Sequence, residues 1–157
     1  MPKATPRARL FPLLVVLLTV ILSTSGQAQN PQGGFPHAAG GGWATDLPGF
    51  VHFAFSAMLN GGATTPRGHG RLNFRNGDYD QGDVICFAVT GNVAQFTIDV
   101  SKKIGGDEFL LVRVQDDVID TLTYQRLQLE PDCTIALVTP TGGGPVSQGN
   151  IVVSDGN

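Results

Sequence analysis

The sequence contains few of the residues from which catalytic and metal sites are usually built. Two cysteines, three histidines and one tryptophan occur in 157 residues. Gly-x-Ser-x-Gly, His-Glu-x-x-His and Cys-x-x-Cys motifs are absent, and no glycine-rich loop is followed by the lysine of a phosphate-binding loop. We therefore expect a protein that is not an enzyme and uses no cofactor, with an enzyme that has an unrecognised site as an open alternative.

Long apolar runs are also absent, apart from one near the N-terminus. Three basic residues precede the apolar run Leu10–Leu22, and the small polar segment Ser23–Ala28 follows it. This run has about 13 residues, fewer than the roughly 20 that a membrane-spanning helix needs. The order of segments is typical of a signal peptide. We expect residues 1–28 to be removed after Ala28, with export through the general secretory pathway to a secreted or periplasmic location.

Basic residues are scarce in the remainder of the chain. Three of the ten lysines and arginines belong to the predicted signal peptide, whereas all thirteen acidic residues follow it. Cleavage would leave seven basic and thirteen acidic residues, a net charge of −6 with neutral histidines. Nucleic acids and anionic membrane surfaces bind to basic patches. We expect neither as a partner, no membrane span after cleavage, and an unknown extracellular or envelope partner.

What remains is dominated by glycine and by two-residue alternation of apolar and polar side chains. Residues 29–39 are rich in Gly, Pro and Gln and predict a flexible lead-in, and residues 40–157 have the size of one domain. The predicted strands are Phe50–Met58, His69–Arg75, Val84–Thr90, Val93–Ser101, Phe109–Gln115, Thr121–Leu129, Cys133–Val138 and Asn150–Ser154. Gly91-Asn92 is typical of a hairpin turn, and residues 140–145 predict a glycine-rich loop.

No segment of useful length has the apolar spacing of an amphipathic helix. About eight short strands, separated by glycine-rich turns, predict an all-β fold: a single antiparallel barrel or sandwich. The only cysteines, Cys86 and Cys133, most simply form one disulfide in an exported chain. Closing a loop of this length stabilises a fold by about 4 kcal/mol in the chain-entropy model.

The segment Arg75–Asp83 (RNGDYDQGD) places Asp78, Asp80 and Asp83 close together between two predicted strands. Such carboxylates are candidate calcium ligands. A helix-loop-helix calcium loop also needs glycine at its sixth position and glutamate at its twelfth, and no frame that starts at Asn76 or Asp78 provides both. Asn and Gly favour turns. We interpret the segment as a turn, with an irregular calcium site as the alternative.

Asp116, Asp117 and Asp120 form a second acidic turn, to which the same interpretation applies. His52 and His69 are expected on neighbouring strands, each on the face opposite the apolar set. As cross-strand neighbours they would approach a zinc site with one carboxylate. No ligand spacing supports such a site, and we interpret both histidines as solvent-facing or hydrogen-bonded.

Aromatic residues give the remaining candidates for a binding site. An eight-stranded barrel either fills its interior with side chains or holds one small ligand. The side chains that would line such a pocket are Phe53, Phe55, Phe74, Phe96 and Phe109, with Trp43 or Tyr124 at its rim. The alternative is that these phenylalanines pack the core. One tryptophan and two tyrosines offer little material for the exposed aromatic platform of a carbohydrate-binding surface.

Short motifs follow one another along most of the chain. Gly40-Gly-Gly-Trp43 precedes the alternating segment His52–Ala57, and Gly68–Phe74, Val89–Asn92 and Gly149–Val153 (GNIVV) follow. In this order they resemble a group of secreted bacterial β domains with a Gly-Gly-Gly-Trp opening and a Gly-Asn-Ile-Val-Val closing strand. The resemblance covers most of residues 40–154 and implies export and a single β domain. The group has no established activity, so the resemblance implies no catalytic residues.

Together these features predict an exported, non-catalytic β domain with a structural or interaction role at the cell exterior. A small barrel that binds an apolar small molecule is the alternative from a different functional class.

The exported protein should begin at Gln29 and contain no free thiol. N-terminal sequencing measures the first property, and thiol titration in denaturant, before and after reduction, measures the second. A thiol that reacts without reduction would contradict the predicted disulfide, and an intact apolar run would contradict the predicted signal peptide.

Overall fold

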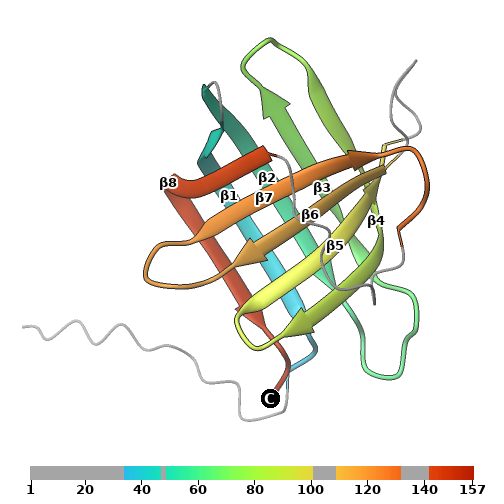
Figure 1. Ribbon diagram of the computed structural model, residues 1–157. Coiled ribbons are helices and arrows are strands. Elements are labelled where there is room, and N and C mark those ends of the chain that lie inside the picture. Colours follow the sequence, from blue (N-terminus) through green and yellow to red (C-terminus); the bar gives the residue numbers. More distant parts are fainter. Residues whose placement is uncertain (1–33, 47–48, 101–108, 132–141) are drawn as a thin grey trace, which may run out of the picture.

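The computed structural model describes residues 34–46, 49–100, 109–131 and 142–157, which form a closed antiparallel barrel (Figure 1). The strands are β1 (His37–Asp46), β2 (Gly49–Met58), β3 (Arg67–Phe74), β4 (Tyr79–Thr90), β5 (Val93–Asp99), β6 (Phe109–Gln115), β7 (Thr121–Leu127) and β8 (Gly142–Ser154). Each strand pairs with the next along the chain, and β8 pairs with β1. The predicted all-β class is confirmed, and of the two predicted architectures the barrel forms. No helix in the described residues is long and apolar enough to cross a membrane.

Two-residue alternation determines which side chains fill the barrel. In β2, Val51, Phe53 and Phe55 are buried, whereas the side chains between them are exposed or half-buried. Successive residues of a strand point to opposite faces of a sheet. One set of side chains therefore fills the interior and the other covers the outside.

The barrel interior is filled by side chains. Phe53 and Phe96 are fully buried, and Phe55 is 6% exposed. The ring centroids of Phe55 and Phe96 lie 4.9 Å apart, and those of Phe53 and Phe55 lie 6.0 Å apart. Burial of each such ring stabilises the fold by about 2–3 kcal/mol. Phe53, Phe55 and Phe96, three of the candidate pocket residues, therefore pack the core instead.

The first and last strands meet through their glycines. β1 and β8 pair along His37–Ala44, and Gly42 lies opposite Gly149. At Gly149 the backbone has a φ of +106°, and a Cβ atom would clash with the carbonyl oxygen of Gly41. Glycine adopts this positive φ without strain and has no Cβ atom that could clash. The Gly-Gly-Gly-Trp and Gly-Asn-Ile-Val-Val motifs are thus paired with each other where the barrel closes.

The sequence does not predict β1, and β8 is longer than the predicted strand Asn150–Ser154. β1 begins at His37, inside the predicted lead-in, and β8 begins at Gly142, inside the predicted loop over residues 140–145. Both segments are rich in glycine and lack alternation, yet their backbones pair with neighbouring strands. Backbone hydrogen bonds, rather than a side-chain pattern, define them. The predicted strand Cys133–Val138 lies outside the described residues.

Cys86, on β4, is partly buried. Its Sγ atom lies 3.7 Å from Oγ1 of Thr97 and 3.8 Å from the carbonyl oxygen of Pro131. Its predicted partner, Cys133, lies outside the described residues, so the disulfide stays a prediction. Pro131 is only two positions before Cys133, and the described chain thus approaches the expected bond.

Two carboxylates bind the edge of β8 where β7 no longer pairs with it. β7 and β8 pair over only four positions, Thr121–Tyr124. Beyond them, Asp120 accepts a hydrogen bond from the amide of Ile151 at 2.7 Å, and Asp116 accepts one from the amide of Val153 at 3.1 Å. These carboxylates satisfy backbone donors that a neighbouring strand would otherwise satisfy. The predicted acidic turn therefore has a structural role.

Asp120→Ala should lower the free energy of unfolding by about 2 kcal/mol, because it leaves the Ile151 amide without its charged acceptor. Asp117→Ala, on the same turn, should cost about 0.5 kcal/mol or less, since the Asp117 carboxylate bonds only to exposed groups of that turn. Urea denaturation of both variants measures the difference. Equal losses would contradict the role given to Asp120.

Candidate functional site

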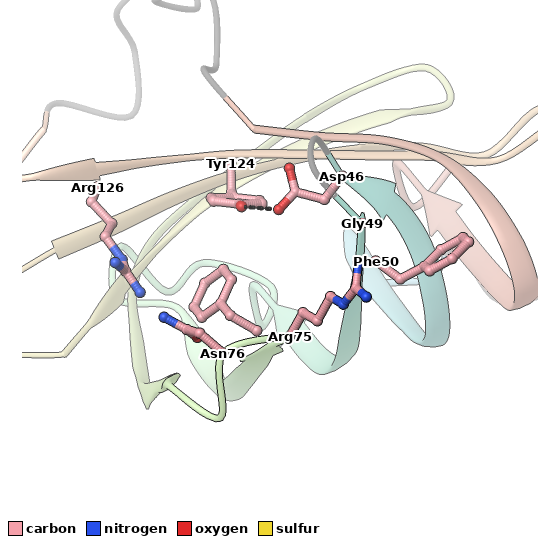
Figure 2. A pocket seen from close by; sticks show the side chains of 8 residues that line it. Asp46, Gly49, Phe50, Arg75, Asn76, Tyr124 and Arg126 are labelled. Carbon is pink, nitrogen blue, oxygen red and sulfur yellow. Dashed lines mark hydrogen bonds between the residues drawn. The ribbon is translucent and has the colours of Figure 1, made fainter.

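A pocket of about 690 Å³ opens at the end of the barrel where β1 ends and β2 begins. We call it the mouth pocket. It is lined by Asp46, Gly49, Phe50, Phe74, Arg75, Asn76, Tyr124 and Arg126. In Figure 2, Tyr124 and Asp46 lie on one side of the pocket. Arg75 and Asn76 lie on the opposite side.

Alternation along β7 brings polar groups to this end of the barrel. Leu122, Tyr124 and Arg126 follow one another at every second position and share the inward face. Leu122 is fully buried, Tyr124 is half-buried and Arg126 reaches solvent. The same face of one strand thus changes from core to pocket wall as it approaches the mouth.

Phe74 is the centre of the aromatic surface in the mouth pocket. Its ring centroid lies 5.4 Å from that of Tyr124, with an angle of 60° between the ring planes. The guanidinium carbon of Arg126 lies 4.5 Å from the centroid of the Phe74 ring, in a cation–π contact. Phe50 is 52% exposed and adds a second ring at the pocket's edge. A bound molecule would therefore meet aromatic faces.

Asp46 joins three strands at the wall of the mouth pocket. The hydroxyl of Tyr124 donates to its Oδ2 atom at 2.6 Å, and the amide of Gly143 donates to its Oδ1 atom at 3.0 Å. Burial, followed by the hydrogen bond to Asp46 and that carboxylate's charge, raises the pKa of Tyr124 above its usual value of about 10. The Tyr124 hydroxyl stays protonated and engaged, so it offers a ligand an acceptor lone pair.

Arg126 is held by two carboxylates at the start of β4. Its Nε atom donates to Oδ2 of Asp80 at 2.7 Å, and its Nη2 atom lies 3.4 Å from Oδ2 of Asp78. Asp80 is 2% exposed, and a buried carboxylate without a partner would be costly. Burial lowers the pKa of Arg126, but the hydrogen bond and charge of Asp80, reinforced by Asp78, outweigh burial and raise it. The charge of Arg126 is therefore compensated inside the protein.

A second pocket, of about 540 Å³, adjoins the first. We call it the rim pocket. It is lined by Trp43, Phe50, His52, Asn73, Phe74 and Arg75. Phe50, Phe74 and Arg75 line both pockets, so the two pockets are adjacent, and we call them together the groove.

A row of side chains from four neighbouring strands runs beside the rim pocket. Trp43 pairs with His52, His52 with Asn73, and Asn73 with Tyr79. The ring centroids of Trp43 and His52 lie 4.9 Å apart, and Nδ2 of Asn73 lies 3.2 Å from Nδ1 of His52. Arg71 donates to Oδ1 of Asn73 at 2.8 Å and lies over the Tyr79 ring. These contacts hold the side chains in place on the outer face of the barrel.

The segment Arg75–Asp83 divides between a turn and a strand. The amide of Phe74 donates to the carbonyl oxygen of Asp78 at 2.8 Å, and Asn76 accepts a bond from the amide of Asp78 at 3.0 Å. Gly77 has a φ of +84°, which favours glycine. Residues 75–78 thus form the turn, and the rest of the segment belongs to β4.

The three aspartates of this segment do not gather around one point. Asp78 and Asp80 meet at Arg126, whereas Asp83 lies on the outer face, 3.2 Å from Nδ1 of His69. Among the residues that the structure describes, no group of three or more His, Cys, Asp or Glu side chains is arranged to hold a metal ion.

His52 and His69 both lie on the outer face, as predicted, and the register does not make them the cross-strand neighbours that a zinc site would need. His52 pairs with Asn73, and His69 pairs with Ser56. Four residues along a strand correspond to roughly 13 Å, so the two rings do not share a site. The register between β2 and β3 depends on the turn and the length of the connection that joins them; this connection spans residues 59–66 and contains a turn in which the amide of Ala63 donates to the carbonyl oxygen of Asn60.

The sequence candidates Trp43, Phe74 and Tyr124 all line the groove, and sequence reasoning missed the polar residues around them. Arg126 could have been found from the sequence, because alternation places this charged residue on the inward face of its strand, where it requires a partner of opposite charge. Asp46 could not, because its partners are 78 and 97 positions away in the chain. Other residues missed in the same way are Phe50, Asn73, Arg75 and Asn76.

Comparison of the chain with protein-family models, with curated proteins and with solved structures found no match. The groove is therefore interpreted from its own geometry and chemistry.

The Tyr124–Asp46 hydrogen bond should make stability depend on pH in the alkaline range. The pKa of Tyr124 is raised in the folded state, so folded Tyr124 keeps a proton that unfolded Tyr124 loses above about pH 10. The stabilisation is complete below about pH 10 and is lost as the pH rises toward the folded-state pKa. Between about pH 8 and about pH 11, the free energy of unfolding should fall more steeply for the wild type than for Tyr124→Phe. Urea denaturation measures both slopes, and parallel curves would contradict this role of the hydrogen bond.

Proposed function

We propose that the protein is an exported, non-catalytic binding domain that holds an uncharged small molecule in the mouth pocket. The observation that carries this proposal is the pocket itself, of about 690 Å³, with Phe50, Phe74 and Tyr124 beside a few polar groups. Volumes of roughly 300–1,000 Å³ and apolar walls with a few placed polar groups are typical of small-molecule sites, which often lie in the mouths of β-barrels.

The filled interior supports binding at the mouth rather than at the centre of the barrel. Phe53, Leu72 and Leu110 are fully buried, and protein interiors are packed too closely to admit a ligand without displacing such side chains. A molecule bound at the mouth would rest on the aromatic surface of Phe74. This position modifies the expected apolar-ligand barrel, because one side of the molecule would face polar groups.

The balance of charge at the mouth supports an uncharged ligand. Asp46, Asp78 and Asp80 contribute three carboxylates, and Arg75 and Arg126 contribute two guanidiniums. A strongly charged molecule would have to compete with partners that these groups already have. A purely apolar molecule would cover polar groups without bonding to them, which is costly. A neutral molecule with hydroxyl or amide groups avoids both costs.

The polar groups of the mouth pocket support a holding role rather than a catalytic one. Tyr124 remains protonated and bonded to Asp46, and Arg126 is bonded to Asp80. The predicted signal peptide and the resemblance to secreted β domains support a secreted or periplasmic location. An interaction role at the cell exterior, expected from the sequence, thus becomes small-molecule binding.

A thermal-shift screen of the purified protein with neutral sugars, aromatic alcohols and lipophilic molecules tests this function. A ligand of the mouth pocket should raise the melting temperature saturably, since binding stabilises the folded state by about 2.7 kcal/mol at 100 times Kd. Phe50→Ala should reduce the shift because it removes one aromatic wall. Its side chain is 52% exposed, so the fold should tolerate the change.

Val118→Ala is the matched control. Val118 is 98% exposed and lies between β6 and β7, at the end of the barrel opposite the mouth. This variant should keep the full shift. The absence of any saturable shift in the wild type, or a shift that Phe50→Ala leaves intact, would contradict the proposed function.

A further inference from the structure

We propose that the groove binds a chain of neutral sugar residues, with one part of the chain in the mouth pocket and the next part over Trp43 in the rim pocket. The inference rests on the proposed function, because it names the ligand class of the mouth pocket and extends that site onto the outer face. Three features carry it: the adjacency of the two pockets, the exposed aromatic rings along them, and the kinds of polar group beside these rings.

The adjacency of the two pockets favours an elongated ligand with repeated units. The mouth pocket has a volume of about 690 Å³ and the rim pocket about 540 Å³. Each lies within the range of roughly 300–1,000 Å³ that holds a small molecule. Phe50, Phe74 and Arg75 are shared by both, so successive units of one chain can occupy the two adjacent pockets and contact the same three side chains.

The sequence has little material for an aromatic platform, but two of its exposed rings, Trp43 and Phe50, line the rim pocket together, and they favour a ligand with flat, weakly polar faces. Trp43 is 45% exposed and Phe50 is 52% exposed, although burial of such rings would stabilise the fold. His52 packs against Trp43 and is itself bonded to Asn73, so the indole is positioned before any ligand binds. Aromatic faces carry negative charge density, which attracts the C–H groups on the face of a sugar ring.

The polar groups beside these rings favour hydroxyl groups as partners. Asn76, Arg75 and Asp46 carry paired acceptors or donors in one plane, and adjacent hydroxyls of a sugar ring present both in a similar arrangement. Asn73 accepts from Arg71 through its oxygen, so its nitrogen donates to Nδ1 of His52. This tautomer of His52 carries its proton on Nε2, which can donate to a ligand.

The same features disfavour a peptide. Each of β1 to β4 already pairs with a strand on both sides, so a peptide cannot bind by adding a strand. A proline-rich peptide can dock on aromatic rings, but it has no donors on its proline nitrogens to match Asp46 and few groups to match Asn76. A sugar chain supplies both the flat faces and the hydroxyls.

Trp43 is the only tryptophan of the chain, so its fluorescence reports on the rim pocket. The purified protein is titrated with glucose and with the linear hexasaccharides maltohexaose, cellohexaose, laminarihexaose and xylohexaose. At least one hexasaccharide should change the Trp43 emission saturably with a Kd below about 1 mM, and glucose should bind at least about tenfold more weakly. Isothermal titration calorimetry measures the affinity independently of fluorescence.

Variants on the outer face locate the sugar chain. Trp43→Ala should weaken hexasaccharide binding about tenfold or more, and Trp43→Phe, which keeps a ring, should recover part of the loss. Met58→Ala is the matched control, because Met58 is a 41% exposed apolar residue on the outer face at the other end of β2. It should bind like the wild type. Urea denaturation confirms that each variant is folded.

The outcomes separate this inference from the proposed function. If hexasaccharides bind without changing the Trp43 emission, and Trp43→Ala keeps full affinity, the ligand lies in the mouth pocket alone. This result overturns the extended site and leaves the proposed function standing. No binding of any hexasaccharide at about 1 mM overturns the sugar proposal, whereas the thermal-shift screen still decides whether the mouth pocket binds another molecule. Saturable binding of a polyproline peptide in place of the sugars would also overturn it.

Discussion

Closure of the barrel between β7, β8 and β1 is the constraint on which the rest of the structure depends. β7 and β8 pair over only four positions, which is little for a strand as long as β8. Carboxylates supply the remaining bonds: Asp46 at the mouth, through Tyr124 and Gly143, and Asp120 and Asp116 at the other end, through amides of β8. Acidic side chains here accept hydrogen bonds from amides of β8, as backbone carbonyl groups do in a regular pair of strands.

This closure also shapes the candidate site. Asp46 holds β1 to β7 and β8, and the same hydrogen bond fixes the hydroxyl of Tyr124 at the wall of the mouth pocket. Asp80 compensates Arg126, whose guanidinium in turn covers Phe74. These contacts position Tyr124, Arg126 and Phe74 before a ligand binds, which lowers the cost of ordering these side chains.

Side-chain alternation explains how much of the fold could be predicted from the sequence. The alternating segment Phe50–Met58 became β2, β6 has the predicted bounds Phe109–Gln115, and the Gly91-Asn92 pair forms the predicted turn, with a φ of +58° at Gly91. All of β1 and the glycine-rich start of β8 escaped prediction because a strand without alternation is defined by its backbone partners. These partners belong to distant parts of the chain.

The candidate site was predictable only where one side chain carries the signal. Trp43 and Tyr124 stand out because the chain has only one tryptophan and two tyrosines. Phe53 and Phe96, by contrast, cannot be told from Phe74 in the sequence, and they belong to the core.

A ligand should rest on the mouth of a filled barrel, and amide chemical-shift mapping by NMR during titration with a bound ligand tests this most directly. The amide chemical shifts of residues that line the groove should change, and those of other residues should not. Changes centred on the turn at Gly91-Asn92, or spread through the core, would contradict binding at the mouth.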